Sequence, residues 1–357
     1  MSRVELRGKT VLVTGVAGFI GSSLARRLLS EEAVTVVGID NLNDYYDVRL
    51  KEARLEVLRA HPAFVFVRGS VADRAAVDAV FAAYRPQIVV HLAAQPGVRA
   101  SITHPEACME SNLTGFLRIL EACRHAADGG APGVKHLVFA SSSSVYGCNG
   151  YAPCGTDDRT DSPVSLYAAT KKSNELFAHA YAGLYGIPAT GLRLFTVYGP
   201  WGRPDMAYFR FTDRLRAGET IRLFNYGNCS RDFTYIDDVV ESMVRVMQRA
   251  PDGTADGEDL QKPPYAVYNV GNGRPVRLLD FVAALQEELI RAGVLPEGDD
   301  LGRYVELAPM QPGDVPATCA DTGALKRDFG FRPRTALRDG LRGFAQWYRA
   351  FYMGTNG

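Results

Sequence analysis

The first half of the chain alternates short apolar runs with segments of helical periodicity. The apolar runs have the length and β-branched content of buried strands, and they occupy residues 10–14, 34–39, 64–67, 88–92 and 136–140. Between the runs, apolar residues recur three and four positions apart, as they do over residues 20–29. Strands that alternate with helices predict βαβ units, and these units predict a doubly wound parallel sheet in an α/β fold.

The pattern changes after about residue 195. A Gly- and Pro-rich turn at 199–204 precedes a helical pattern at 209–216 and a short strand at 221–224. Residues 266–270 have the pattern of a buried strand that rejoins the main sheet, after an exposed loop over 251–264. Beyond residue 274 we expect two amphipathic helices and a Pro- and Gly-rich connector at 309–316. We therefore expect a Rossmann domain over residues 1–195, to which 233–273 returns, and a smaller α/β domain over 196–232 and 274–357.

The composition narrows the class of protein. The 357 residues include 40 Lys and Arg against 40 Asp and Glu, and this balance argues against a broad basic surface for nucleic acid or membranes. The chain has no run of about 18 apolar residues that would predict a membrane span. Six cysteines without a CxxC pair predict free thiols in a reducing compartment, and no His, Cys and carboxylate spacing predicts a metal site. The N-terminus is polar and has no apolar stretch typical of a secretory signal, so we expect a cytoplasmic protein. The residue spacings lead us to expect no metal.

A glycine-rich loop joins the first predicted strand to the first predicted helix. Gly15, Gly18 and Gly21 stand in the sequence TGVAGFIG at residues 14–21. Glycine permits a tight turn and a close approach of the backbone to a pyrophosphate, and the helix N-terminus attracts the phosphates. Three glycines alone mark only a tight turn. Their position between a strand and a helix indicates a dinucleotide site.

An acidic residue ends the second predicted strand. Asp40 follows Gly15 by 25 positions, where a carboxylate accepts hydrogen bonds from both hydroxyls of the adenosine ribose. The alternative is a turn-forming role for Asp40 in the sequence DNLN. A carboxylate there repels a 2′-phosphate, so the sequence favours NAD over NADP.

A tyrosine and a lysine four residues apart are the candidate catalytic pair. Tyr167 and Lys171 share one face of a predicted helix, and Ser142 ends a predicted strand 25 residues earlier. We expect the lysine and a positively charged nicotinamide to lower the pKa of the phenol, so that Tyr167 works as a base while Ser142 orients the substrate hydroxyl. The alternative is a surface tyrosine beside a solvated lysine.

Several motifs together resemble those of a known superfamily. TGVAGFIG, HLAA at 91–94, SSSSVYG at 141–147 and YAATK at 167–171 are similar to motifs of the extended short-chain dehydrogenase/reductases. Within that superfamily, residues 40–58, 91–101 and 195–207 (FTVYGPWGRPDMA) closely resemble the bacterial UDP-glucuronate 4-epimerases. The resemblance implies a tightly held NAD that is reduced and reoxidised in each turnover. It also implies interconversion of UDP-glucuronate and UDP-galacturonate through a transient 4-keto intermediate.

The resemblance also assigns roles to residues. It implies that Ser142, Tyr167 and Lys171 are catalytic. It implies NAD contacts in the first domain from Gly15, Gly18, Phe19, Ile20, Gly21, Asp40, Asn41, Asn43, Ser70, Val71, Ala93, Ala94, Tyr167 and Lys171. It implies contacts to the UDP-sugar from Ser142, Ser143, Ser144, Thr196, Arg203, Met206, Arg210, Arg231 and Asp314. Among these, Thr196 and Arg203 would bind the hexuronate carboxylate, while Arg231 and Asp314 would bind the nucleotide diphosphate and its ribose. A homodimer through the helices over 109–124 and 167–185 is implied as well.

Two positions depart from the superfamily pattern. Ser70 stands where an aspartate usually binds the adenine amino group, so NAD retention could be weaker. Gln311 stands where galactose epimerases carry an arginine near the phosphates, so that role would pass to Arg210 or Arg231.

Other readings stay open at the level of sequence. UDP-galactose and UDP-N-acetylhexosamine 4-epimerases would share the whole core. A UDP-glucuronate decarboxylase or a 4,6-dehydratase would usually carry an acidic residue after Ser142, where this chain has Ser143 and Ser144. A catalytically silent NAD-binding protein is a third class. Arg203 alone would also suit a residue that stabilises its loop, and Arg231 alone would suit a surface ion pair with Asp232.

Overall fold

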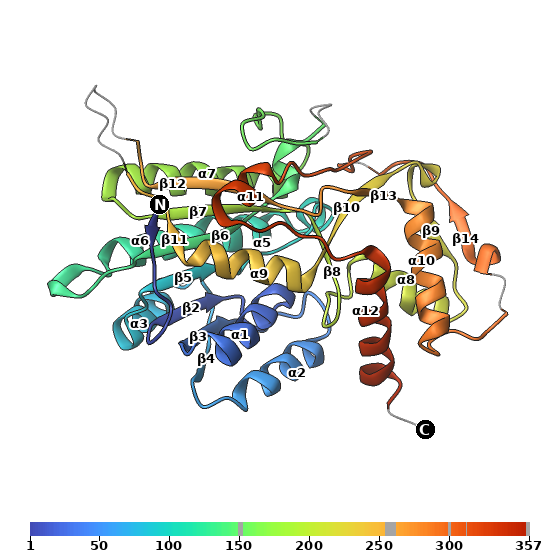
Figure 1. Ribbon diagram of the computed structural model, residues 1–357, viewed down its shortest axis with the longest axis horizontal. Coiled ribbons are helices and arrows are strands. Elements are labelled where there is room, and N and C mark those ends of the chain that lie inside the picture. The colour runs from blue at the N-terminus through green and yellow to red at the C-terminus, as the bar shows by residue number, and fades with distance from the viewer. Residues whose placement is uncertain (149–152, 254–261, 299–300, 312, 355–357) are drawn as a thin grey trace.

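A computed structural model describes residues 1–148, 153–253, 262–298, 301–311 and 313–354, and its centre is a seven-stranded sheet (Figure 1). All neighbouring strands of this sheet are parallel. In spatial order the strands are β12 (Tyr265–Val270), β7 (Ala189–Leu194), β6 (His136–Ser142), β5 (Ile88–His91), β2 (Thr10–Thr14), β3 (Thr35–Asp40) and β4 (Phe64–Arg68). The five strands predicted in the first half are all present, and β12 rejoins the sheet as predicted.

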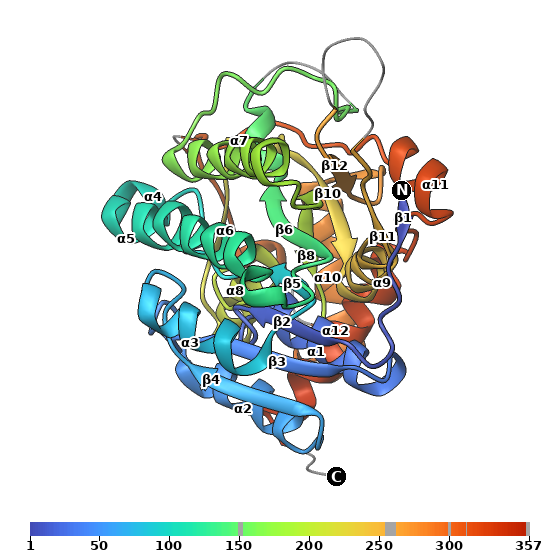
Figure 2. The ribbon, with the colours of Figure 1, turned by 90° about the vertical axis from the view of Figure 1, so that its left-hand side faces the viewer.

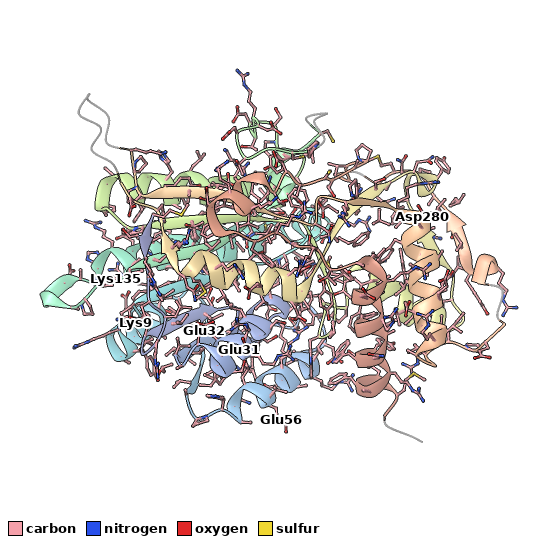
Figure 3. All side chains as sticks on the ribbon, in the orientation of Figure 1. Lys9, Glu31, Glu32, Glu56, Lys135 and Asp280 are labelled. Carbon is pink, nitrogen blue, oxygen red and sulfur yellow. The ribbon has the colours of Figure 1, made fainter. Side chains whose placement is uncertain are left out.

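Helices cover both faces of the sheet (Figure 2). On one face lie α1 (Phe19–Glu31), α2 (Val48–Arg59) and α9 (Ile236–Met247); on the other lie α3 (Arg74–Tyr84), α6 (Gly115–His125) and α7 (Leu166–Tyr185). The strands are apolar on both sides because each face is buried, and charged side chains such as Glu56 and Lys135 lie outside (Figure 3). The short α11 (Gly323–Phe329) packs against β12. Among the described residues, no helix is long and apolar enough to cross a bilayer.

The helix expected over 109–124 is interrupted. The chain forms α4 (Ala100–Thr103) and α5 (Pro105–Met109), then a π-helical turn at Glu110–Thr114, and only then α6. Asn112 lies in the π-helical turn, and its buried amide bonds to both backbone groups of Gln95. The irregular turn therefore fixes the loop that follows β5, which borders the site described below.

The smaller part of the chain is built around an aromatic core. It contains two small sheets, β13 (Pro275–Arg277)–β10 (Ser230–Tyr235)–β8 (Thr196–Tyr198) and β9 (Ile221–Leu223)–β14 (Val305–Leu307), with helices α8 (Ala207–Arg216), α10 (Leu278–Arg291) and α12 (Leu337–Tyr352). Phe233 and Phe281 stack with ring centroids 4.2 Å apart, and Tyr208, Phe209 and Phe344 are fully buried beside them. The two predicted C-terminal helices are α10 and α12.

Some expected loops are only partly described. Residues 254–261 of the loop expected over 251–264 lie outside the described residues, and so does residue 312 of the connector expected over 309–316.

A further short pair of strands, β1 (Ser2–Arg3) with β11 (Arg249–Ala250), joins the N-terminus to the chain segment after α9.

Because two histidines are buried, we expect acid to lower the free energy of unfolding. Burial lowers the pKa of His91 to about 3 and that of His136 to about 4, so both rings are neutral in the folded protein. The unfolded chain takes up these protons below about pH 6.5, and the free energy of unfolding should therefore fall as the pH is lowered from 6.5 to 4. Each histidine contributes a slope of at most about 1.4 kcal/mol per pH unit.

Urea unfolding followed by circular dichroism at several pH values measures this slope. His136→Gln should reduce the slope, whereas His104→Gln, at an exposed position, should leave it unchanged. Equal slopes in the unmodified protein and in the His136 variant would show that the ring titrates normally in the fold.

Candidate active site

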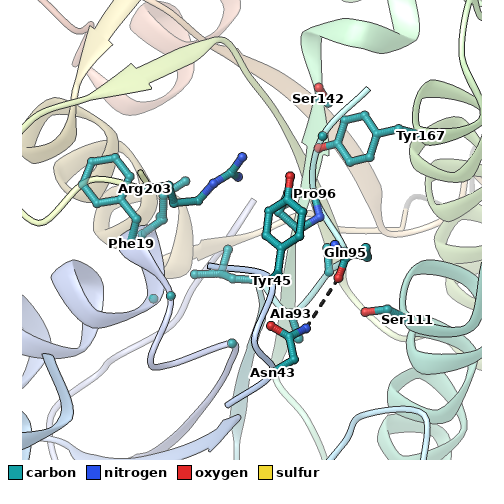
Figure 4. Close-up of a pocket in the computed structure, with 18 of the residues that line it drawn as sticks. Phe19, Asn43, Tyr45, Ala93, Gln95, Pro96, Ser111, Ser142, Tyr167 and Arg203 are labelled. Atoms are coloured by element: carbon teal, nitrogen blue, oxygen red, sulfur yellow. Dashed lines mark hydrogen bonds between the residues drawn. The ribbon is translucent and has the colours of Figure 1, made fainter. Parts of the chain in front are cut away.

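A cavity of about 600 Å³ lies at the carboxyl edge of the large sheet (Figure 4). The loops that follow β2, β3, β5, β6 and β7 all line it, as expected for a parallel sheet whose strand ends meet at one edge. Every residue that the sequence implicated in NAD contact lines this cavity, as do Ser142, Ser143, Ser144, Thr196, Arg203 and Met206. Residues that are far apart in the sequence are therefore brought together at one place.

The glycine-rich loop has the shape that a bound pyrophosphate requires. A Cβ atom on Gly21 would lie 2.2 Å from the carbonyl oxygen of Gly15, and one on Gly18 would lie 2.9 Å from the same oxygen. Gly15 has φ +69°, a conformation that side chains disfavour. Gly18 caps α1 without a side chain, so the first N–H groups of α1 remain available to phosphate oxygens. The loop residues thus fit a dinucleotide.

Asp40 is fixed by two backbone hydrogen bonds. One carboxylate oxygen accepts a bond from the N–H of Ala17 at 3.0 Å, and the other accepts from the N–H of Leu42 at 2.9 Å. Asp40 therefore has the turn-forming role that the sequence left open, and it also lines the cavity. The Lys51 ammonium lies 2.6 Å from both the backbone and the side-chain oxygen of Asn43, which orders the loop. Sequence reasoning missed Lys51, although a lysine on the apolar face of α2 was a visible signal.

The three candidate catalytic residues come from β6 and α7. Ser142 ends β6, and Ser165 caps α7, whose first turns carry Tyr167 and Lys171. The Ser142 hydroxyl accepts a hydrogen bond from the N–H of Ser144 at 3.1 Å. In Figure 4 the Tyr167 ring lies beside Ser142 at the cavity wall. The predicted triad is therefore assembled around the cavity.

The electrostatics of the pair differ from the expectation. The Lys171 ammonium donates to the carbonyl oxygen of Ala140 at 2.8 Å, and burial lowers its own pKa to about 8. Burial also raises the pKa of the Tyr167 phenol, while the charge of Arg203 and the hydrogen bond with Ser142 act in the opposite direction. Desolvation thus dominates the pKa of Tyr167 in this structure, and the charge that lowers it is that of Arg203. The expected combined effect of Lys171 and a positively charged nicotinamide stays a prediction.

Arg203 is already paired within the chain. Its Nε lies 2.9 Å from Oδ1 of Asp205, and its Nη2 lies 2.7 Å from Oδ2. The resemblance implied that Arg203 binds a substrate carboxylate, and the structure shows that the Nε and Nη2 edge of its guanidinium is occupied by Asp205. Sequence reasoning missed Asp205 and also Tyr45, which lines the cavity from the loop after β3.

A second cavity of about 370 Å³ adjoins the first. The two share Ser143, Ser144 and Thr196 in their walls, and the second is also lined by Arg231 and Asp314. The residues expected to contact a nucleotide diphosphate and its ribose thus lie next to the candidate catalytic residues.

Two arginines near the second cavity, Arg231 and Arg99, differ in their surroundings. Arg231 donates to the carbonyl oxygens of Ser230 and Pro316, whereas Asp232 is buried and accepts from the N–H of Ala320. The alternative of a surface ion pair between Arg231 and Asp232 was wrong because the two side chains point to different partners. Arg99, which the sequence did not implicate, forms an ion pair with Asp314 at 2.9 Å.

Arg210 lies apart from the other candidate substrate residues. It is exposed on α8, lines neither cavity, and has its pKa lowered by burial and by the charges of Arg99 and Arg214. A role for Arg210 at the phosphates is therefore less well supported than one for Arg231. In the described part of the chain, no three His, Cys, Asp or Glu side chains group as metal ligands.

A buried arginine links the cofactor loop to the turn that carries Arg203. Arg54, on α2, donates through Nη1 to the carbonyl oxygen of Ala17 at 2.9 Å. Its Nη2 donates to the carbonyl oxygens of Trp201 at 2.6 Å and Gly202 at 3.0 Å. One side chain thus joins the nucleotide loop of the first domain to the start of the second.

Comparison with known proteins agrees with this geometry. A model of the NAD dependent epimerase/dehydratase family matches residues 11–271. The chain belongs to this family. As a member of an NAD-dependent family, this epimerase/dehydratase uses NAD as its cofactor, and the cavity residues described above fit that dinucleotide.

Relatives match this epimerase/dehydratase along nearly its whole length. The probable UDP-glucuronate 4-epimerase of Rhizobium meliloti is 43% identical over 349 residues, which cover 96% of this chain and 97% of the relative. Protein CapI of Staphylococcus aureus is 45% identical over 348 residues, with 96% and 99% coverage. The crystal structure of the UDP-glucuronic acid 4-epimerase from Bacillus cereus with UDP-glucuronic acid and NAD has a TM-score of 0.83 at 30% identity, with 96% and 100% coverage.

Proposed function

We propose that this protein interconverts UDP-glucuronate and UDP-galacturonate by epimerisation at C4 of the sugar. The carrying observation is that Arg203 and Thr196 line the same cavity as Ser142 and Tyr167, so that a cation and a hydroxyl stand within reach of the sugar that the catalytic residues would act on. The full-length similarity to a probable UDP-glucuronate 4-epimerase supports the same substrate. UDP-galactose and UDP-N-acetylhexosamine lack the carboxylate that Arg203 would bind.

In the proposed reaction, the catalytic residues remove and return the proton of the C4 hydroxyl. Tyr167 removes this proton during oxidation to the 4-ketone and returns it during reduction, while Ser142 orients the oxygen. Lys171 holds the end of β6 through Ala140 and binds the nicotinamide ribose. Bound NAD supplies the acceptor and later the donor of the hydride at C4. If the ketone turns its opposite face toward the cofactor before the hydride returns, the product is the C4 epimer.

The hexuronate poses a problem that a neutral sugar does not. The 4-ketone of a glucuronate is a β-keto acid, which loses CO₂ when the bond between C5 and the carboxylate lies parallel to the π system of the ketone. Hydrogen bonds from Thr196 and Arg203 to the carboxylate would fix this torsion away from the parallel arrangement. The chain would thereby act as an epimerase and not as a decarboxylase.

The two parts of the chain divide the ligands between them. We propose that residues 1–195, with 233–273, bind NAD, and that residues 196–232 and 274–357 bind the UDP moiety in the second cavity. Arg231 and Asp314 line that cavity and support this division. Asp314 is shared with Arg99, so Arg99 also belongs near the nucleotide.

A homodimer and a cytoplasmic location complete the proposal. Apolar side chains are exposed on α7, where Leu176 is 58% and Leu184 is 72% accessible, and Met109 of α5 is also exposed. Such a face suits a contact between copies of the chain. The location rests on composition and on the scattered cysteines.

Incubation with UDP-glucuronate without added NAD, followed by NMR of the products, tests the function. UDP-galacturonate supports the proposal, and a UDP-pentose would instead indicate a decarboxylase. The same assay with UDP-galactose and UDP-N-acetylglucosamine tests the alternative epimerases. No change with any of these sugars would count against all of them and favour a silent NAD-binding protein.

The two carboxylate contacts give a separate prediction. Arg203→Ala and Thr196→Val should each increase the release of CO₂ from UDP-glucuronate, because the carboxylate is no longer held out of the parallel arrangement. Measurement of CO₂ and of the UDP-pentose by NMR checks this. If both variants still oxidise C4 and neither releases more CO₂, then these contacts do not control the outcome.

A further inference from the structure

Asp205 lies beside Arg203 and Tyr45, which line the first cavity, and it has no role in the steps above. It follows Arg203 by two positions, and its carboxylate makes two parallel hydrogen bonds to the Arg203 guanidinium at 2.9 and 2.7 Å. The side chains of both residues are largely buried, at 23% and 28% accessibility. A pair of parallel bonds from a partly buried carboxylate fixes both the position and the plane of a guanidinium.

Tyr45, which lines the cavity, also holds Asp205. Its hydroxyl donates to Oδ2 of Asp205 at 3.3 Å, from the loop that follows β3. Burial, with the charge of Asp205, raises the pKa of Tyr45 to about 12, so this hydroxyl stays protonated and remains a donor. Gly97 makes room for it, since a Cβ atom there would lie 2.9 Å from the Tyr45 oxygen. Figure 4 shows Tyr45 between Arg203 and Tyr167.

The pairing decides which end of Arg203 can meet a ligand. Asp205 occupies Nε and Nη2, and Sδ of Met206 lies 3.8 Å from Nη2. Within the described chain, Nη1 makes no hydrogen bond. A carboxylate in the cavity would therefore accept a hydrogen bond from Nη1 of the guanidinium and not from its Nε edge.

We propose that Asp205 is a positioning residue, which holds Arg203 so that its Nη1 end sets the torsion of the substrate carboxylate and thereby keeps the reaction on the epimerisation route. This inference rests on the proposed function. Asp205 also balances the charge of Arg203, so the carboxylate is held by directed hydrogen bonds more than by an unpaired positive charge. The substrate therefore gains a defined torsion as well as affinity.

A loss of this control has a defined chemical result. When the carboxylate turns parallel to the π system of the ketone, the bond between C5 and the carboxylate carbon breaks. Its electron pair passes into the ketone as an enolate, CO₂ leaves, and C5 takes up a proton. The products are CO₂ and a UDP-4-keto-pentose, and the hydride removed from C4 would stay on the cofactor. These products distinguish this route from epimerisation, in which the hydride returns to C4.

Asp205→Asn in the full chain tests the inference with UDP-glucuronate as the probe. The amide keeps the size of the side chain and removes the charged pair with Arg203. We expect the ratio of UDP-4-keto-pentose to UDP-galacturonate to rise by about tenfold or more, because a misplaced group of this kind costs factors of 10 to 100 in a competing step. Tyr45→Phe is the matched control, since it retains the ion pair and should change the ratio less.

Each other outcome is also decisive. An unchanged product ratio overturns the inference, and so does a fall in both products at a constant ratio, which would indicate only a structural role. If Asp205→Asn does not fold, Asp205→Glu retains the charge but moves the guanidinium by the length of one methylene, and an unchanged ratio in that variant overturns the inference equally. Failure of the unmodified protein to convert UDP-glucuronate would instead refute the proposed function.

Discussion

Tyr167→Phe should reduce kcat for UDP-glucuronate by about 10²–10⁴-fold. The phenylalanine retains the ring that packs beside Ser142 but cannot accept or return the proton of the C4 hydroxyl. The nearest other hydroxyls in the cavity, including that of Ser142, are far weaker bases at neutral pH. The rate of UDP-galacturonate formation, followed by NMR at saturating substrate, measures the effect.

The control for this prediction is the bound cofactor. Tyr167→Phe should retain NAD and its thermal unfolding midpoint, because the glycine-rich loop and Asp40 are untouched. Ser142→Ala should lose less activity, since Ser142 orients the substrate but does not carry the proton away. A Tyr167 variant with kcat within a few-fold of the unmodified protein would show that another group is the base.

Arg193→Met should lower the free energy of unfolding by about 3–5 kcal/mol. Arg193 lies on β7 and forms a bidentate ion pair with Glu175 of α7 at 2.8 and 2.9 Å, with both side chains almost fully buried. The Ser141 hydroxyl also donates to Glu175 at 2.6 Å. Methionine fills much of the space but leaves the buried Glu175 carboxylate with only the more distant Lys172 ammonium, 3.7 Å away, as a cation. Urea unfolding followed by circular dichroism measures the loss.

Two further variants separate this effect from a general one. Arg193→Met with Glu175→Gln should recover part of the stability, because the poorly compensated buried charge of Glu175 is gone. Arg74→Met is the matched control, since it breaks an exposed ion pair with Asp78 on α3 and should cost at most about 1 kcal/mol. Equal losses for Arg193→Met and Arg74→Met would mean that the buried pair contributes no more than the exposed one.

The sequence predicted the sheet well because its signals are local. Each predicted parallel strand is a largely apolar run of four to seven residues, and the glycine-rich loop needs only the strand before it and the helix after it. Strand β7 was not predicted, since its sequence ATGLRL includes a glycine and the charged Arg193. The end residues of β3 and β6, Asp40 and Ser142, therefore fell at the cavity once the strands were correctly placed. The helix over 109–124 was predicted as one element, whereas the structure places a π-helical turn at Glu110–Thr114 within it.

The electrostatics of the site could not be predicted in the same way. The pairing of Arg203 with Asp205 depends on how one turn folds against the loop that bears Tyr45, and these segments are about 160 residues apart. The direction of the shift in the pKa of Tyr167 depends on how deeply the fold buries the phenol. Spacing identified the residue types that meet, but burial and orientation decide what each of them does.

The position of Arg54 implies thermodynamic linkage between the two ligands. Its guanidinium holds the Ala17 carbonyl of the loop that would bind NAD and the Gly202 carbonyl of the turn that precedes Arg203. A ligand that orders one of these segments lowers the entropy cost of ordering the other. Because linkage is reciprocal, UDP-glucuronate should tighten the binding of NAD by the same factor by which NAD tightens the binding of UDP-glucuronate. The sugar nucleotide would then help this chain to keep its cofactor through a turnover, even though Ser70 replaces the usual adenine-binding aspartate.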